Sequence, residues 1–259
     1  MRDSDRHVAI AEMLGRVPFA SVRDLQERLN VSAATIRRDI DRLHEMGKVR
    51  KVHGGIASVE GAGLAARPYD ENRDLAVEAK RAIAAQAETL VRDGDSLIIN
   101  AGSTCFEFGS RLANRNVRIY TNSMPLAAYL GEHGSCHLAI AGGELYREPS
   151  IIHDVSAGAP NFYASKFFLG AQGVGAEGLL ESHPLLRVVV ENFSRRADQV
   201  ILLADSRKFS IRPRHAVLPL QRVSAVVTDD GLSDADARML EDAGVSIIIA
   251  NSSFARESV

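Results

Sequence analysis

The sequence predicts an α/β protein with a small N-terminal winged helix-turn-helix domain followed by a mostly parallel α/β domain. Two observations support this fold class. Three helix-forming segments lie close together near the N-terminus, and a basic hairpin pattern follows them. From Ala76 onward, short runs rich in Val, Ile and Leu alternate with helix-like segments, which is typical of a parallel sheet covered on both faces.

Composition excludes several classes of protein. The chain has 259 residues, of which 46% are hydrophobic and 25% charged, as in soluble globular proteins. No apolar run approaches the roughly 20 residues of a membrane span, and the N-terminus MRDSDRHVAI carries acids where a signal peptide would be basic and then apolar. We therefore expect a cytoplasmic protein with no membrane partner.

The first two helices are predicted from apolar spacing and from their ends. Apolar residues at helical spacing favour a helix from Arg6 to Leu14, which Gly15 can end. The tetrad SVRD is a capping box, in which Ser21 caps a second helix and Asp24 lies three residues after the cap. Asn30 closes that helix.

The third helix combines a buried face with a basic face. Ser32 caps a run in which Ile36, Ile40 and Leu43 share one side. Small residues and arginines occupy the opposite side and its flanks, so guanidinium groups can reach phosphates or guanine edges in a DNA groove. For a charge run alone, a solvated surface helix is the commoner alternative, but the capping box ahead of it favours a helix-turn-helix.

A basic hairpin follows the third helix. Gly47 ends the helix, and KVRKVHGG then alternates as a strand and turn, the pattern of a wing. Between Val31 and Ser58 six Lys or Arg face three acids, although the formal net charge of the whole chain is −2. Such local positive charge suits site-specific DNA binding. The predicted DNA-contacting residues are Ser32, Thr35, Arg37, Arg38, Arg42, Arg50, Lys51 and His53.

These residues carry a resemblance to a known family. The segment resembles the N-terminal domain of the DeoR family of bacterial transcriptional regulators over about 55 residues. The matching positions are Arg6, Ile10 and Leu14, then the signature S-x-x-T-[apolar]-R-[basic]-D-[apolar] at Ser32 to Ile40, then Gly47 and the HGG of His53 to Gly55. The resemblance implies double-stranded operator DNA as a partner.

A linker separates the two predicted domains. Residues 58–75, SVEGAGLAARPYDENRDL, mix Gly, Ala, Pro and charge without periodicity, so they form either a hinge or a plain surface connection. We expect a DNA-binding domain at 1–57, the linker at 58–75, an α/β effector-binding and oligomerisation domain at 76–251 and a tail at 252–259.

Seven apolar runs predict the strands of the second domain. They lie at 96–100, 117–121, 137–142, 166–171, 200–205, 224–229 and 246–250. Helices are expected at 76–92, 104–113, 123–131, 187–199 and 234–243. Small and polar residues stand where most of these runs stop, and in open parallel sheets ligands bind outside the carboxyl ends of the strands.

The strand ends predict an anion-accepting crevice. Gly102 lets the backbone approach a ligand, Ser103 and Thr104 open a helix whose N-terminus can donate to a phosphate, and Lys208 can neutralise it. Each loop taken alone could instead be turn chemistry with a helix cap. The predicted effector-binding residues are Asn100, Gly102, Ser103, Thr104, Thr121, Asn122, Ser123, Gly142, Gly143, Gln172, Asp205 and Lys208.

The second domain also resembles the DeoR family, in its sensor domain. The matches are N-x-G-S-T at Asn100 to Thr104, TNS at Thr121 to Ser123, the glycine pair at 142 and 143, and L-A-D-S-x-K-F at Leu203 to Phe209. That sensor is related in fold to sugar-phosphate isomerases and recognises phosphorylated sugars. The N-x-GST and F-x-GAQG forms are similar to the branch that includes the ascorbate-phosphate repressor.

The resemblance implies a repressor of a carbohydrate catabolic operon, controlled by a phosphorylated sugar. A homodimer or homotetramer is expected, because two linked heads multiply DNA affinity. Ser165 and Gln172 stand where many members have acids and where related isomerases keep carboxylates, which weighs against an enzyme. Two alternatives stay open: an isomerase-like enzyme with an accessory DNA-binding domain, and an α/β domain that only oligomerises.

Metal and thiol chemistry are not expected. Cys105 and Cys136 offer neither a disulfide framework nor a metal quartet, and His153 and His183 have no partner at metal-ligand spacing. The sequence therefore predicts no cofactor and no metal. Cys105 at a helix N-terminus could be reactive, but a buried filler is the more common role.

Overall fold

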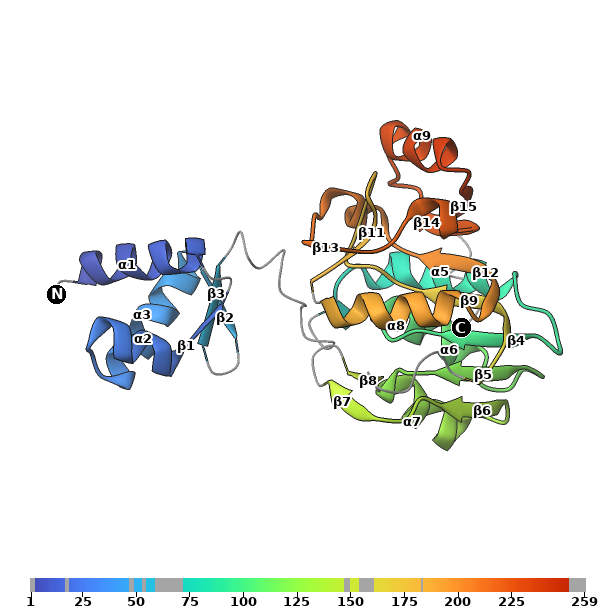
Figure 1. The fold of residues 1–259 in the computed structure, drawn as a ribbon, viewed down its shortest axis with the longest axis horizontal. Coiled ribbons are helices and arrows are strands. Elements are labelled where there is room, and N and C mark those ends of the chain that lie inside the picture. Colours follow the sequence, from blue (N-terminus) through green and yellow to red (C-terminus); the bar gives the residue numbers. More distant parts are fainter. Residues whose placement is uncertain are drawn as a thin grey trace. The chain divides into compact units, whose positions relative to one another are not determined.

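The computed structural model describes residues 3–16, 19–46, 49–52, 55–58, 72–146, 150–153, 161–182 and 184–251. The chain forms two compact units, Met1–Ala66 and Arg67–Val259, each described by itself (Figure 1). Residues 59–71 of the predicted linker and the predicted tail lie outside the described residues, so the domain boundaries stay predictions. In the described part of the chain, no helix has the length and apolar character needed to cross a membrane.

The first unit contains the predicted helices and hairpin. Its elements are α1 (Asp3–Arg16), β1 (Phe19–Ser21), α2 (Val22–Leu29), α3 (Ala33–Glu45), β2 (Val49–Val52) and β3 (Gly55–Ser58). Strand β1 was not predicted; it pairs with β3, so the small antiparallel sheet has the order β1-β3-β2. A Cβ at Gly55 would collide with the carbonyl oxygen of Ala20, which is why glycine stands here.

Local capping defines where α2 and α3 begin. The Ser21 side chain accepts from the Asp24 N–H at 3.1 Å, and the Ser21 N–H donates to Asp24 Oδ2 at 3.0 Å, which confirms the capping box. Asn30 ends α2 in the left-handed conformation, with φ of 51°. Ser32 caps α3 by accepting from the Thr35 N–H at 3.2 Å. Apolar residues from all three helices and β3 form one core: Ile10, Leu25, Ile36, Leu43 and Ile56 are fully buried.

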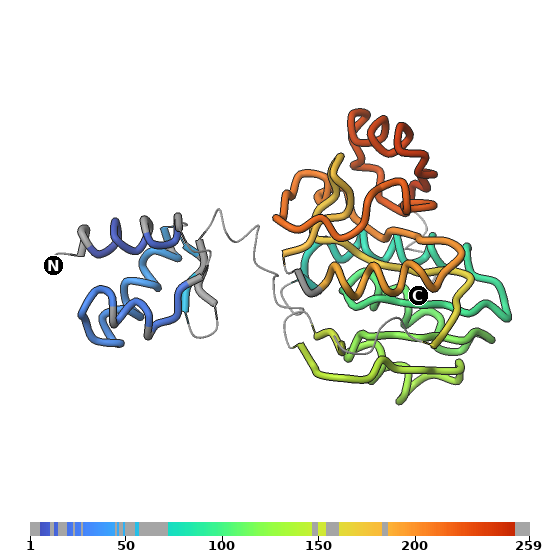
Figure 2. The backbone as a smooth tube through the Cα atoms, in the orientation of Figure 1, coloured from blue at the N-terminus to red at the C-terminus, as the bar shows by residue number. Residues whose placement is uncertain are grey.

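All seven predicted strands lie in one seven-stranded parallel sheet, which confirms that part of the fold. The strands are β4 (Ser96–Ile99), β5 (Arg118–Thr121), β6 (His137–Ile140), β9 (Ala164–Leu169), β12 (Ala197–Leu203), β14 (Ala225–Asp229) and β15 (Ser246–Ala250). Their order is β15-β14-β12-β9-β4-β5-β6, and every pairing is parallel. Figure 2 shows the order as a progression from red and orange strands at one end of the sheet to green strands at the other.

Helices cover both faces of this sheet. Helices α5 (Val77–Glu88), α6 (Ser103–Arg111) and α7 (Met124–His133) pack on one face, where Leu97 and Ile99 point. Helices α8 (Pro184–Ser194) and α9 (Asp234–Asp242) pack on the other face with Ile98. In Figure 1, α8 lies in front of the sheet and α5 behind it. The helix expected at 187–199 is too long, because it ends at Ser194 and β12 begins at Ala197.

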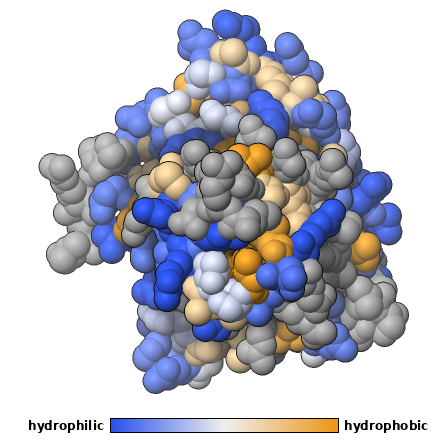
Figure 3. All heavy atoms as spheres, turned by 90° about the vertical axis from the view of Figure 1, so that its left-hand side faces the viewer, coloured by the Kyte–Doolittle hydropathy of each residue, from blue (hydrophilic) through white to orange (hydrophobic). Residues whose placement is uncertain are grey.

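Two small antiparallel elements were not predicted. Strands β10 (Gly173–Gly175), β11 (Gly178–Glu181) and β13 (His215–Leu218) form one sheet, and β7 (Glu144–Tyr146) pairs with β8 (Ile151–His153). The first follows the carboxyl end of β9 and packs beside the 3-10 helix η1 (Ser206–Ser210). Strands of three or four residues give too little alternation to be recognised in a sequence, and β10 and β11 also contain glycine. On the face that Figure 3 shows, the described residues are mainly hydrophilic, with smaller hydrophobic patches.

Candidate functional site

The outward face of α3 carries exposed arginines. Ile36 and Ile40 are buried, whereas Arg37, Arg38 and Arg42 are exposed. Within the described part of the chain, Arg37 and Arg38 have no hydrogen-bond or ion-pair partner. Both guanidinium groups are therefore available to an external anion such as a DNA phosphate.

The two polar residues that open α3 have internal roles. The Ser32 hydroxyl caps the helix, and its oxygen lies 2.9 Å from Thr35 Oγ1. The hairpin positions are only partly described. Arg50 and Lys51 lie in β2, opposite Ala57 and Ile56 of β3, while His53 lies outside the described residues.

A buried ion pair fixes α3 against α1. The Arg6 side chain donates to both carboxylate oxygens of Asp39, at 2.7 Å and 3.0 Å, and His7 Nε2 lies 3.1 Å from Oδ1. Arg6 is 7% exposed and Asp39 4%. Burial alone would raise the pKa of Asp39, but Arg6 and His7 outweigh it and hold that pKa below its ordinary value. The sequence had placed both residues in the family signature without pairing them.

The second unit has a topological switch point between β4 and β9. The chain leaves β4 through α6 on one face towards β5, whereas it leaves β9 through β10 and β11 towards α8 on the other face. β4 and β9 are neighbours, and the Asn100 N–H donates to the Phe168 carbonyl at 2.9 Å. Open α/β sheets bind ligands at such a point. Asn100, Gly102, Ser103 and Gln172 all follow these two strands.

Unsatisfied amides face this point. Because Ile99 pairs with Thr121, Asn100 and Asn122 are neighbours where β4 and β5 end. Asn122 Oδ1 accepts from the Ala101 N–H at 2.9 Å. Among the described residues, Asn122 Nδ2 and Asn100 Oδ1 are buried and have no hydrogen-bond partner. A buried donor and a buried acceptor without partners are costly, so this position favours a ligand that carries hydroxyl groups.

The α6 N-terminus lies beside these amides. Gly102 precedes α6 with φ of 143°, a conformation that favours glycine, and an added Cβ would meet open space. No side chain caps α6. Thr104 is buried in the first turn, and Ser103 is half-buried. An uncapped helix N-terminus with neighbouring hydroxyls can accept an anion.

The hydroxyls of two predicted contact residues have hydrogen-bond partners inside the protein. The Thr121 hydroxyl donates to the Ile99 carbonyl at 2.7 Å and accepts from the Ser123 N–H at 3.1 Å. Ser123 caps α7 by accepting from the Leu126 N–H at 3.3 Å. Their hydroxyls are used inside the protein, so we expect Thr121 and Ser123 to position Asn122 rather than to contact a ligand.

Gln172 lies beside a carboxyl group that the sequence did not single out. The Gln172 N–H donates to Glu181 Oε1 at 3.3 Å, at the end of β11. Burial raises the pKa of Glu181 to about 7, and the charge of Lys208 partly opposes this shift. We call Asn100, Ser103, Asn122, Gln172, Glu181 and Lys208 the switch-point cluster. In the sequence, the only signal for Glu181 was the short turn between β10 and β11, which brings the end of β11 back towards Gln172, and neither strand was predicted.

Ser165 does not lie near Gln172 at the switch point. Ser165 lies at the amino end of β9, where its hydroxyl donates to Asp95 Oδ1 and to the Ser96 carbonyl, both at 3.1 Å. That end is about 20 Å from Gln172 at 3.3 Å per residue. Residue 165 therefore says nothing about chemistry at the switch point.

Asp205 is already bound by another side chain, and Gly142 and Gly143 lie to the side of the other predicted effector-binding residues. Asp205 is 1% exposed and binds Arg207 through hydrogen bonds of 2.7 Å and 3.2 Å, so it enters the site as part of an ion pair. Gly142 and Gly143 are exposed and follow the edge strand β6, two strands from β4. Strands lie about 4.8 Å apart, which places the glycines roughly 10 Å to the side of Asn100.

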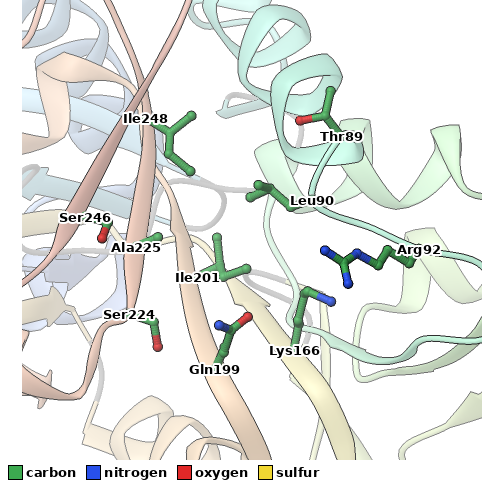
Figure 4. A pocket seen from close by; sticks show the side chains of 10 residues that line it. All are labelled: Thr89, Leu90, Arg92, Lys166, Gln199, Ile201, Ser224, Ala225, Ser246 and Ile248. Carbon is green, nitrogen blue, oxygen red and sulfur yellow. The ribbon is translucent and has the colours of Figure 1, made fainter.

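A pocket of about 460 Å³ lies at the opposite edge of the sheet (Figure 4). It is lined by Thr89, Leu90, Arg92, Lys166, Gln199, Ile201, Ser224, Ala225, Ser246 and Ile248. Several of these residues stand near the amino ends of their strands, so this pocket is separate from the switch point. Lys166 in it already binds Asp95 at 2.7 Å.

Neither thiols nor metal ligands form a site in the part of the chain that the structure describes. No group of three or more His, Cys, Asp or Glu residues there could hold a metal ion. Cys105 is 1% exposed, and burial raises the pKa of its thiol to about 12. A thiol with that pKa is unreactive at neutral pH, so Cys105 is a buried filler.

Both units match known protein families. Residues 6–62 match a DeoR-like helix-turn-helix domain, and residues 75–230 match the DeoR C terminal sensor domain. The HTH-type transcriptional regulators UlaR of Shigella dysenteriae serotype 1 and of Escherichia coli strain K12 / DH10B are each 30% identical to this chain over 249 residues, which are 96% of this chain and 99% of theirs.

Solved structures give only weak overlaps. The ribose 5-phosphate isomerase A of Methanocaldococcus jannaschii overlaps with a TM-score of 0.38 at 18% identity, over 50% of this chain and 53% of that one. The translation initiation factor eIF-2B of Pyrococcus horikoshii OT3 overlaps with a TM-score of 0.39 at 17% identity, over 87% and 82%. At these scores the overlaps assign neither activity nor ligand.

Proposed function

Because this chain belongs to the DeoR family and is a DNA-binding transcriptional regulator, we propose that it represses a carbohydrate catabolic operon under the control of a phosphorylated sugar. The chain is a regulator and not an enzyme, since the relatives that match it over nearly their full length are HTH-type transcriptional regulators. Operator DNA is thus its partner, and a cytoplasmic location is part of the proposal.

In the DNA-binding unit, α3 enters the major groove and the β2–β3 hairpin contacts the backbone. The arginines Arg37 and Arg38 support this, because they are exposed and have no partner among the residues that the structure describes. Arg42 follows one turn later on the same helix, and Arg50, Lys51 and His53 are proposed to act from the hairpin. Ser32 and Thr35 hold the start of the helix and bring its first turn close to the DNA.

In the sensor unit, the phosphorylated sugar binds at the switch-point cluster. The observation that carries this proposal is the pair of buried, unpartnered amide atoms of Asn100 and Asn122 beside the uncapped N-terminus of α6. The helix N-terminus suits the phosphate, and the amides suit sugar hydroxyls. In an oligomer, the sugar can regulate DNA binding only if it binds one arrangement of the subunits' DNA-binding units better than another, because equal affinity shifts no equilibrium. A homodimer or homotetramer is proposed on the same ground.

A salt titration of DNA binding tests the first half. The full chain is titrated with a DNA fragment that flanks its own gene, at several salt concentrations. Arg38→Ala removes about one phosphate contact, so it should weaken binding and reduce the salt slope by about 1. Arg81→Ala is the matched control, because Arg81 is an exposed arginine of the sensor unit whose nearest acid is Glu78 at 3.3 Å. Equal affinity and slope for Arg38→Ala and Arg81→Ala would refute the docking of α3.

A thermal shift with a panel of sugar phosphates tests the second half. A ligand at 100 times its dissociation constant stabilises the folded state by about 2.7 kcal/mol. Asn122→Ala should abolish that shift at the same concentration. If no sugar phosphate stabilises the wild-type chain, the α/β domain only oligomerises.

A further inference from the structure

We propose that Lys80 is an anion-binding residue of the switch-point cluster, and that a bound phosphate draws Lys80 and Ser103 away from the chain segment that leads in from the DNA-binding unit. This inference rests on the proposed function, because it concerns how the same site regulates. The segment concerned, residues 72–75, is called the lead-in segment below.

Lys80 is a buried cation whose hydrogen bonds, among the residues that the structure describes, go to backbone carbonyls. It lies on α5 and is 3% exposed. Its ammonium group donates to the carbonyl oxygens of Asn72 and Arg73, the latter at 3.5 Å. A neutral carbonyl offers this ammonium group no counter-charge, whereas a phosphate would add the Coulomb attraction of a second full charge to the hydrogen bond. A phosphate within reach would therefore compete successfully for this group.

Ser103 binds the same carbonyl from the other side. The Ser103 hydroxyl, in the first turn of α6, donates to the Asn72 oxygen at 3.4 Å. Ser103 is also a member of the switch-point cluster, next to the uncapped α6 N-terminus. The Asn72 carbonyl thus occupies the position of an acceptor for two donors that a phosphate at α6 would use. Ligand and lead-in segment compete for these two side chains.

The charges around Lys80 favour an anion at this position. Asp205 and Glu107 attract the charge of Lys80, whereas Lys208 and Arg207 repel it. Asp205 is already bound by Arg207 through two hydrogen bonds, so it offsets the cations only in part. Burial lowers the pKa of Lys80 to about 8, with further lowering by Lys208. Lys80 is therefore still mainly protonated at neutral pH.

The lead-in segment ends in a strained hinge. Ala76, directly before α5, has φ of 48°, a left-handed conformation that is uncommon for a residue with a Cβ. Such a conformation costs about 1 kcal/mol or more and persists only when its surroundings hold it. The hydrogen bonds of Lys80 and Ser103 to the lead-in segment supply that support. Their loss would let Ala76 relax and change the direction from which the chain enters α5.

The coupling follows from competition. If binding of the phosphate and docking of the lead-in segment exclude each other at Lys80, each weakens the other by the same factor. The lead-in segment joins the sensor unit to the residues that precede it, and the chain divides into its two units at Ala66 and Arg67. Ligand therefore alters the tether of the DNA-binding unit without touching that unit.

Hydrogen–deuterium exchange on the full chain tests the competition, with inorganic phosphate as the probe. Phosphate should raise amide exchange in residues 72–76 and lower it in the first turn of α6. The α5 interior, for example Ala84, should not change. If phosphate binds and protects α6 while exchange in 72–76 stays the same, the competition is refuted and the proposed effector site stands.

Affinity measurements test the role of Lys80. Lys80→Met keeps the length of the side chain but removes its charge, so it should weaken phosphate binding by at least about tenfold and should abolish the change in exchange at 72–76. Arg92→Met is the control, because Arg92 is an exposed cation beside the pocket at the other edge of the sheet. Equal phosphate affinity in wild type and Lys80→Met overturns this inference alone.

A second variant separates binding from folding. Ser103→Ala removes one hydroxyl from a half-buried position and should leave the thermal transition of the sensor unit nearly unchanged. It should still raise the basal exchange of 72–76, since one of the two side-chain donors to the Asn72 carbonyl, Lys80 and Ser103, is lost. Unchanged basal exchange would refute the shared-acceptor geometry. If neither phosphate nor any sugar phosphate binds the wild-type chain, the proposed effector site fails together with this inference.

Discussion

Replacing Asp39 by Asn should strongly destabilise the DNA-binding unit while the stability of the sensor unit stays unchanged. Asp39 is the acid of the α3 signature, and it accepts two hydrogen bonds from Arg6 of α1. The side chains of Arg6 and Asp39 are only 8% and 6% exposed. Asn keeps the shape of Asp but removes its charge, so the Arg6 guanidinium would stay buried without a counter-charge.

The expected loss of stability is large compared with the free energy of unfolding of the DNA-binding unit. Removing one partner of a buried ion pair costs about 3–5 kcal/mol. A compact unit the size of residues 1–66 has a total stability of roughly 3–10 kcal/mol at about 0.05–0.15 kcal/mol per residue. The loss therefore takes up a large part of the stability of this unit. None of it falls on the sensor unit, whose core is separate.

Urea denaturation followed by circular dichroism should resolve the two units. In Asp39→Asn the transition of the DNA-binding unit should move to much lower urea, and DNA binding should be lost while phosphate binding by the sensor persists. Asp41→Asn is the matched control, because Asp41 is an exposed acid two residues away on the same helix. If both variants shift that transition equally, the ion pair does not hold α3 in place.

Two further measurements sharpen this test. The pKa of Asp39 lies below its ordinary value of 3.8, so the ionised pair adds stability above that value and the contribution is lost as pH falls through the lowered pKa. The first transition should therefore weaken only below about pH 4 in the wild type. The double variant Arg6→Met with Asp39→Leu leaves no unpaired charge and should recover part of the lost stability.

Three other outcomes are expected. Gly55→Ala should destabilise the DNA-binding unit, because the new Cβ would strike the Ala20 carbonyl; an unchanged urea midpoint of that unit would contradict the packing of β3 on β1. Sulfate affinity, measured by calorimetry, should fall in two steps as pH rises from 6.5 to 9. Glu181, with its pKa raised to about 7, gains negative charge in the lower step, and Lys80, with its pKa lowered to about 8, loses positive charge in the upper step. The variant Glu181→Gln should show only the step that belongs to Lys80. Cys105, buried and with its pKa raised to about 12, should resist iodoacetamide in the native chain, and rapid native labelling would speak against its burial.

The sequence predicted those parts of the fold that are encoded locally. The capping box at Ser21 and the cap at Ser32 depend on residues three apart, so they could be recognised without any tertiary information. The seven apolar runs marked the parallel sheet because strands buried on both faces need continuous Val, Ile and Leu. The missed strands β1, β7, β8, β10, β11 and β13 are only three or four residues long, and β1 and β13 pair with strands distant in the chain.

The candidate site was predicted less completely than the fold. Residues that follow β4 and β9 could be located because the carboxyl ends of parallel strands share one edge of a sheet. Lys80 and Glu181 could not, because each comes from an element whose placement depends on the whole domain. Thr121 and Ser123 matched a motif, yet their hydroxyls proved to be used internally.

By itself, the sequence determined the identity of the helix-turn-helix, the positions of the parallel strands along the chain and the chemistry available at their ends. Periodicity and capping act over a few residues, and a family signature is read position by position. Only the tertiary structure decided that Arg6 neutralises Asp39, that the amides of Asn100 and Asn122 are left without partners, and that Lys80 shares an acceptor with Ser103. Those relations depend on burial and on side chains brought together across the chain, and neither is written in local spacing.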